Sequence, residues 1–150
     1  MKKVDLMKVI NLILLSFFIQ SSKAQNLRRD SSIHLDIEFG EHFKKDKVDL
    51  FINDSLIFKN AILTSNKYYG LTYVWVTVEK KNGRYFISTS ETKTSYPITI
   101  DSEVGKINLR YHGKLKKFEI KSVRGKYVVF NTGRHSEITC TQTVRPPLFD

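Results

Sequence analysis

The chain has few of the residues that cross-link or interrupt small folds: one cysteine, Cys140, and three prolines in 150 residues. A single thiol cannot form an internal disulfide, so stability has to come from packing and strand pairing. Cys140 alternates with threonines, which favours a buried core thiol over a nucleophile. No cysteine stands near the N-terminus, so the lipid anchor of a bacterial lipoprotein is not expected.

The sequence also lacks the short motifs that identify common catalytic and metal centres. It has no Gly-x-Ser-x-Gly elbow, phosphate-binding glycine loop, paired-cysteine zinc spacing or His-Glu-x-x-His. We therefore predict no catalytic, cofactor-binding or metal-ligating residue and expect no cofactor. His34, Asp36 and Glu38 alternate along one strand and could approach one ion, but a solvated strand face requires polar residues anyway. Scattered carboxylates that meet in space could still form a glycosidase-like pair, so an enzyme remains an alternative.

The first 24 residues carry the three parts of a cleavable signal peptide. Three lysines stand within residues 1–8, an apolar run follows from Val9 to Ile19, and small residues occupy positions 22 and 24. A membrane-spanning helix needs about 20 apolar residues, which makes a retained anchor the weaker interpretation. We expect cleavage after residue 24 and a secreted, periplasmic or cell-surface protein with no transmembrane segment.

The remaining 126 residues are basic, with 21 Lys and Arg against 14 Asp and Glu, a net charge of +7. This length suits one domain, which we place at residues 33–150 after a flexible lead-in at residues 25–32. Positive charge favours anionic partners such as acidic polysaccharides. Because the chain is expected to be exported, we do not expect it to bind nucleic acid. The lysines also keep the surface soluble and protect strand edges.

The hydrophobic pattern predicts an all-β domain. Apolar and polar residues alternate from Ile33 to Phe39, and Asn53–Asp54 is a typical two-residue turn between strands at 48–52 and 55–58. Residues 40–47 are expected to form a charged loop. Further strands are expected at 71–78, 84–88, 97–100, 106–111, 115–122, 127–131 and 137–144. We predict an antiparallel β-sandwich of about nine short strands, with a small β-barrel as the alternative.

Two surfaces are candidates for binding. Tyr73 and Trp75 share one side of the strand expected at 71–78, where they form either part of a doubly packed core or an exposed aromatic platform for sugar rings. The second candidate is an anion-binding strip with six basic residues: Arg110, Lys114, Lys117, Lys121, Arg124 and Lys126. Its alternative interpretation is a solvated, lysine-guarded strand edge.

These features together favour an exported, non-catalytic binding or accessory module that prefers anionic or glycan surfaces. The expected partner is an anionic polysaccharide, another glycan or an envelope protein. The alternatives are a structural subunit of a surface assembly, which would use an exposed strand edge, and a small secreted hydrolase or inhibitor.

Overall fold

The computed structural model describes residues 33–92, 94–100, 105–133 and 137–147; the predicted signal peptide and lead-in lie outside the described residues. Within them the chain is mostly β and contains no α-helix, only the 3-10 helix η1 (Ser122–Arg124). The strands, in chain order, are β1 (Ile33–Phe39), β2 (Lys44–Ile52), β3 (Ser55–Thr64), β4 (Trp75–Lys81), β5 (Arg84–Thr89), β6 (Tyr96–Ile98), β7 (Gly105–Tyr111), β8 (Lys114–Ile120), β9 (Tyr127–Thr132) and β10 (Ile138–Thr143).

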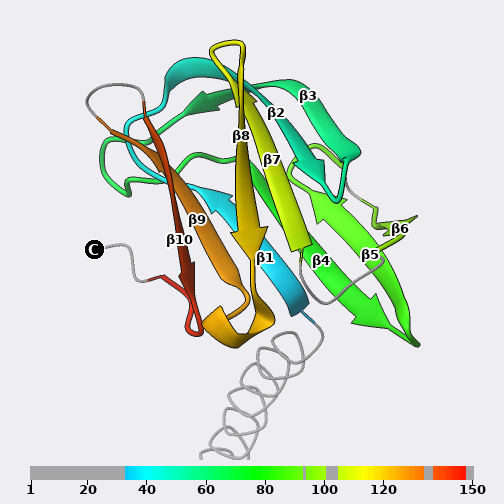
Figure 1. Ribbon diagram of the computed structural model, residues 1–150. Helices are drawn as coiled ribbons and strands as arrows, with labels where there is room; N and C mark the ends of the chain where they lie inside the picture. The colour runs from blue at the N-terminus through cyan, green and yellow to red at the C-terminus, as the bar shows by residue number, and fades with distance from the viewer. Residues whose placement is uncertain (1–32, 93, 101–104, 134–136, 148–150) are drawn as a thin grey trace, which may run out of the picture. The chain divides into compact units, whose positions relative to one another are not determined.

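These strands form two sheets (Figure 1). The six-stranded sheet has the order β10-β9-β1-β4-β5-β6, and the four-stranded sheet has the order β3-β2-β7-β8. The mostly β, two-sheet character agrees with the sequence prediction, and the ten strands of the described residues are close to the predicted number of about nine. The predicted antiparallel pairing is wrong at one place, because β1 and β9 run parallel, with Ile37 opposite Val128. Alternation indicates which face of a strand is buried, but it does not indicate which distant strand lies beside it.

Three hairpins close through two-residue turns with positive φ at both positions. The φ angles are 45° and 64° at Asn53–Asp54, 50° and 76° at Asn82–Gly83, and 47° and 74° at His112–Gly113. Such turns match the right-handed twist of the strands that they join, and asparagine, aspartate and glycine tolerate them best. The two-residue turn that the sequence predicted at Asn53–Asp54 is confirmed.

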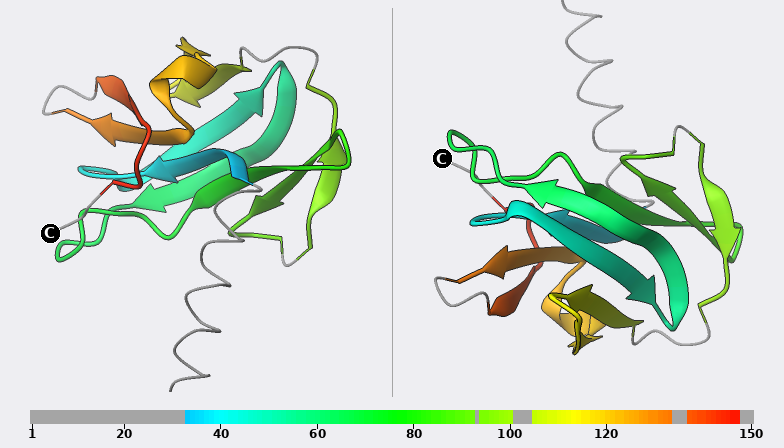
Figure 2. Two further views of the ribbon diagram at one scale, coloured as in Figure 1. Left: turned by 90° about the horizontal axis from the view of Figure 1, so that it is seen from below. Right: turned by 90° about the horizontal axis from the view of Figure 1, so that it is seen from above.

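The hydrophobic core lies between the two facing sheets (Figure 2). Phe39 on β1 is fully buried, and its ring centroid lies 5.9 Å from that of Phe58 on β3, in the other sheet. It also lies 6.0 Å from Phe43 and 5.8 Å from Phe130. A second bridge joins the sheets where Phe118 on β8 meets Phe130 on β9, at 5.0 Å. Aromatic rings therefore hold the sheets together along much of their shared face.

Three strand boundaries differ by four residues or more from those that the sequence predicted. β2 begins at Lys44, inside the segment expected to be a charged loop, and β3 continues to Thr64 rather than ending at residue 58. Exposed charged residues do not prevent pairing when the partner strand supplies the backbone hydrogen bonds. β4 starts at Trp75 instead of residue 71, because the N–H of Thr72 bonds to the carbonyl of Phe39 and residues 71–74 form no ladder.

Replacing Phe39 with alanine is expected to lower the free energy of unfolding by about 3–5 kcal/mol, since it removes the ring that joins the two sheets and leaves a cavity. The matched control is Tyr68→Ala, which truncates a side chain that is 85% exposed and should change stability by less than about 0.5 kcal/mol. Urea denaturation measures both variants. Equal losses would contradict the central position of Phe39 in the core.

Candidate functional site

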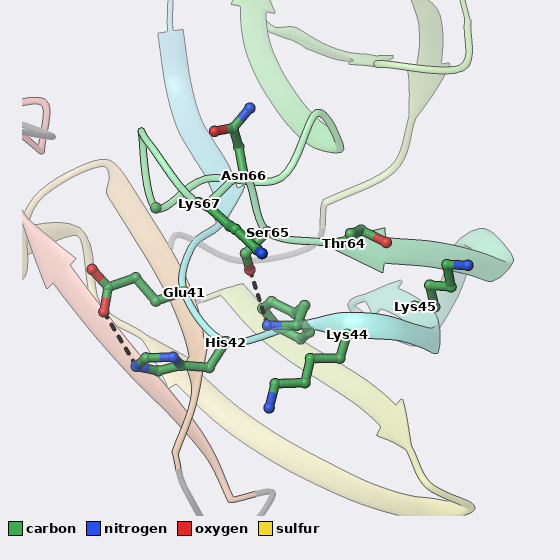
Figure 3. A pocket seen from close by; sticks show the side chains of 10 residues that line it. Glu41, His42, Lys44, Lys45, Thr64, Ser65, Asn66 and Lys67 are labelled. Carbon is green, nitrogen blue, oxygen red and sulfur yellow. Dashed lines mark hydrogen bonds and ion pairs between the residues drawn. The ribbon is translucent and has the colours of Figure 1, made fainter.

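A groove of about 600 Å³ opens between the β1–β2 connection and the end of β3 (Figure 3). Residues 41–45 form one wall, and residues 64–67 with Gly70 form the other. We call this hollow the lysine groove, because three of its lining residues are lysines. It combines two segments that are separated in the sequence by most of β2 and β3, which explains why the sequence pattern alone did not reveal it.

The walls of the lysine groove are held together by Ser65. Its hydroxyl accepts a hydrogen bond from the N–H of Phe43 at 2.9 Å and donates one to the carbonyl of Gly40 at 2.5 Å. The N–H of Ser65 also donates to the carbonyl of Phe43, at 3.0 Å. Because the ring of Phe43 is buried in the core, these bonds attach both walls to the rigid part of the domain.

Asn66 organises the turn that follows. Its side-chain oxygen accepts a bond from the N–H of Tyr68 at 2.8 Å, and its carbonyl accepts one from the N–H of Gly70 at 3.0 Å. Gly70 has a φ of 64°, and a Cβ there would lie 3.2 Å from Cγ of Glu41. A glycine therefore lets the turn approach the opposite wall of the groove closely.

The charge of the lysine groove is predominantly positive. Lys44, Lys45 and Lys67 are exposed, and among the residues that the structure describes none of their ammonium groups has an ion-pair partner. The carboxylate of Glu41 lies 3.5 Å from Nε2 of His42, on one side of the groove (Figure 3). A hollow with several unpaired ammonium groups and one carboxylate attracts anions.

Exposed aromatic side chains adjoin the groove. Tyr68 and Tyr69 form the tip of the turn between Lys67 and Gly70, and both are exposed. Tyr73 is 79% exposed, and Nδ2 of Asn66 lies 3.2 Å from its hydroxyl oxygen. We call Tyr68, Tyr69 and Tyr73 the aromatic loop. Trp75, at 40% exposure, is not a fully buried core residue, which was one of its two interpretations from the sequence.

Trp75 lies opposite Glu38 of β1 on the six-stranded sheet. Burial and the negative charge of Asp36 raise the pKa of Glu38, and Oε2 of Glu38 is buried with no hydrogen-bond partner among the described residues. Burial also raises the pKa of Asp36, although a hydrogen bond from Thr77 at 3.0 Å and the charge of Lys126 act in the opposite direction. The described residues contain no group of three His, Cys, Asp or Glu side chains that could hold a metal ion.

The six residues of the predicted anion-binding strip do not converge. Nη1 of Arg110 lies 3.1 Å from Oδ2 of Asp49, and Nζ of Lys121 lies 3.4 Å from Oε2 of Glu119, so each of these two charges already has an acidic partner. Lys114 and Lys117 are an odd number of positions apart on β8 and therefore project to opposite faces. Arg124 belongs to η1, and Lys126 lies between η1 and β9. β8 itself is an edge strand of the four-stranded sheet.

Cys140 is half-buried against the core on β10, and burial raises the pKa of its thiol to about 11. A thiol with so high a pKa is almost entirely protonated at neutral pH, whereas the thiolate is the nucleophile. This position agrees with the core interpretation of the residue.

Comparisons with protein-family models, with curated protein sequences and with solved structures found no match to this chain. Within the part of the chain that the structure describes, no helix is long and apolar enough to cross a membrane.

Replacing Glu38 with glutamine is expected to raise the melting temperature at pH 7. Because folding raises the pKa of Glu38, the folded state binds the proton more tightly than the unfolded state, and stability falls as pH rises through the raised pKa. The variant lacks this charge, so the difference in melting temperature between variant and wild type should vanish below about pH 3, where the wild-type carboxyl is protonated in both the folded and the unfolded state.

The matched control is Glu91→Gln, which makes the same change at an exposed position. Thermal melts of the wild type and both variants, recorded from about pH 3 to pH 7, measure how the melting temperature of each protein depends on pH. A wild type that is more stable than the Glu38 variant at pH 7 would contradict the desolvation argument.

Proposed function

We propose that this chain is an exported, non-catalytic β-sandwich module that binds anionic glycans at the lysine groove. The observation that carries the proposal is the coincidence of two features at one place: unpaired lysines around a hollow and exposed tyrosines beside it. The export signal, the net positive charge and the absence of catalytic motifs from the sequence support the same function.

The unpaired lysines favour an anionic ligand. Lys44 and Lys45 come from β2, and Lys67 comes from the opposite wall, so both walls of the groove contribute positive charge. Attraction between exposed charges is screened over about 10 Å at 0.1 M salt, so these short-range contacts persist at moderate ionic strength and weaken at high salt.

The aromatic loop favours a ligand whose acidic group is attached to a sugar ring. The C–H groups of a pyranose ring pack against the negative face of an aromatic ring. The tyrosines of the loop are exposed, and the bond between Asn66 and Tyr73 fixes one of them beside the groove. Because a tyrosine loses little conformational entropy when it is held in this way, stacking there costs less than it would on a mobile side chain.

The lysines of β8 are better explained by edge protection. β8 has no neighbour on one side, and lysines on an edge strand discourage pairing with another chain. The β8 lysines provide a matched control for the groove lysines, because the same Lys→Glu changes can be made on β8 and in the groove.

The test is a binding titration of the protein with polygalacturonate, an anionic polysaccharide, and with dextran, a neutral one. We expect Lys44→Glu with Lys67→Glu to weaken polygalacturonate binding by about tenfold or more, because two attractive charges become repulsive. The control, Lys116→Glu with Lys117→Glu on β8, has the same net charge and should change affinity by less than about twofold.

Two results would overturn the proposal. If neither polysaccharide binds at low salt, the groove is not a glycan site. If the groove and β8 variants weaken binding equally, the attraction comes from net charge and not from the groove.

A further inference from the structure

The lysine groove shares lining residues with two smaller hollows. Lys45 also borders a hollow of about 380 Å³ that is lined in addition by Lys47 and Arg110. His42 and Lys44 also border a third hollow, of about 290 Å³. Because each smaller hollow has at least one lining side chain in common with the groove, the three concave surfaces are neighbours along the start of β2.

The carboxylates in the two smaller hollows already have partners. Asp46 accepts a hydrogen bond from the N–H of Lys44 at 2.8 Å and lies 3.2 Å from Nε2 of His112. Asp49 is buried, accepts a bond from a backbone N–H of β3 at 2.7 Å and lies 3.1 Å from Arg110. These partners reduce the repulsion that each carboxylate would exert on an anionic ligand.

The lysines along the same path do not have such partners. Lys47 is exposed and, like the three groove lysines, forms no ion pair with any residue that the structure describes. The side chains of Lys44 and Lys45 leave β2 in different directions (Figure 3). Lys45 therefore lines the hollow of about 380 Å³, whereas Lys44 lines the hollow of about 290 Å³. Four ammonium groups are thus distributed along neighbouring hollows instead of being gathered around one point.

We infer that the ligand is a linear acidic polysaccharide that occupies the lysine groove and an adjoining hollow with successive sugar units; this inference rests on the proposed function. A single sugar acid fills one hollow and meets only some of the four lysines. In a chain, the second acidic unit binds at the high effective concentration that its linkage to the first imposes, so affinity increases steeply with length. The aromatic loop favours a sugar chain over a phosphate chain of equal charge.

The experiment measures the affinity of the whole protein for galacturonate and its oligomers of increasing length by calorimetry. We expect an increase of about a hundredfold from the monomer to the tetramer. Lys47→Glu should weaken tetramer binding by about tenfold and leave monomer binding unchanged, because Lys47 lines only the adjoining hollow. The control Lys116→Glu should affect neither. Linear polyphosphate of matched charge should bind more weakly than the tetramer.

The outcomes separate this inference from the proposed function. If the monomer and tetramer bind equally tightly, or if Lys47→Glu has no effect on the tetramer, the site holds a single sugar and the inference is wrong while the proposed function stands. If polyphosphate binds as tightly as the tetramer, the ligand is not recognised as a sugar. If polygalacturonate itself does not bind, the proposed function fails as well.

Discussion

The candidate site depends on the hydrogen bonds of one hydroxyl group. Ser65 lies just after the end of β3, yet its side chain is bonded to Phe43 and Gly40, which belong to the connection between β1 and β2. The pairing of Lys44 with Thr64 already joins the walls where they belong to β2 and β3, and the hydroxyl bonds extend this attachment beyond the ends of those strands. With these bonds, backbone segments from both sheets are fixed around one hollow, and the buried ring of Phe43 attaches that hollow to the core. The lysine groove is therefore a property of the fold and not only of surface composition.

The placement of charge follows a consistent pattern around this hollow. Asp49 is buried and is held by a backbone N–H and by Arg110, and Asp46 is held by a backbone N–H and faces His112. A buried carboxylate needs such partners, because desolvation without them is costly. The lysines remain exposed and unpaired among the described residues, so the net attraction for anions acts outwards.

The sequence supplied the local features of the fold. Alternation from Ile33 to Phe39 predicted a strand with one buried face, and the pair Asn53–Asp54 predicted a hairpin turn, because few residue types tolerate its backbone angles. The parallel pairing of β1 with β9 was not predictable, since strand alternation carries no information about distant partners. The same alternation placed Tyr73 and Trp75 in one strand, although β4 starts only at Trp75.

The candidate site was predicted less well than the fold. The class of ligand that we propose rests on net charge and on the predicted signal peptide, but the residues that line the groove were not the ones that the sequence emphasised. Six basic residues near β8 are close in the sequence and diverge in the structure, whereas Lys44 and Lys67 are far apart in the sequence and line one groove. Spatial neighbourhood in a β domain is determined by strand pairing, which residue spacing does not reveal.

The most direct test of the account is an NMR titration of the isotope-labelled protein with tetragalacturonate, which locates the ligand without altering any residue. The account predicts that the largest changes in backbone amide shifts fall on residues 41–47 and 64–70, around the lysine groove. If the largest changes fall on β8, or are spread evenly over all basic residues, the lysine groove is not the binding site.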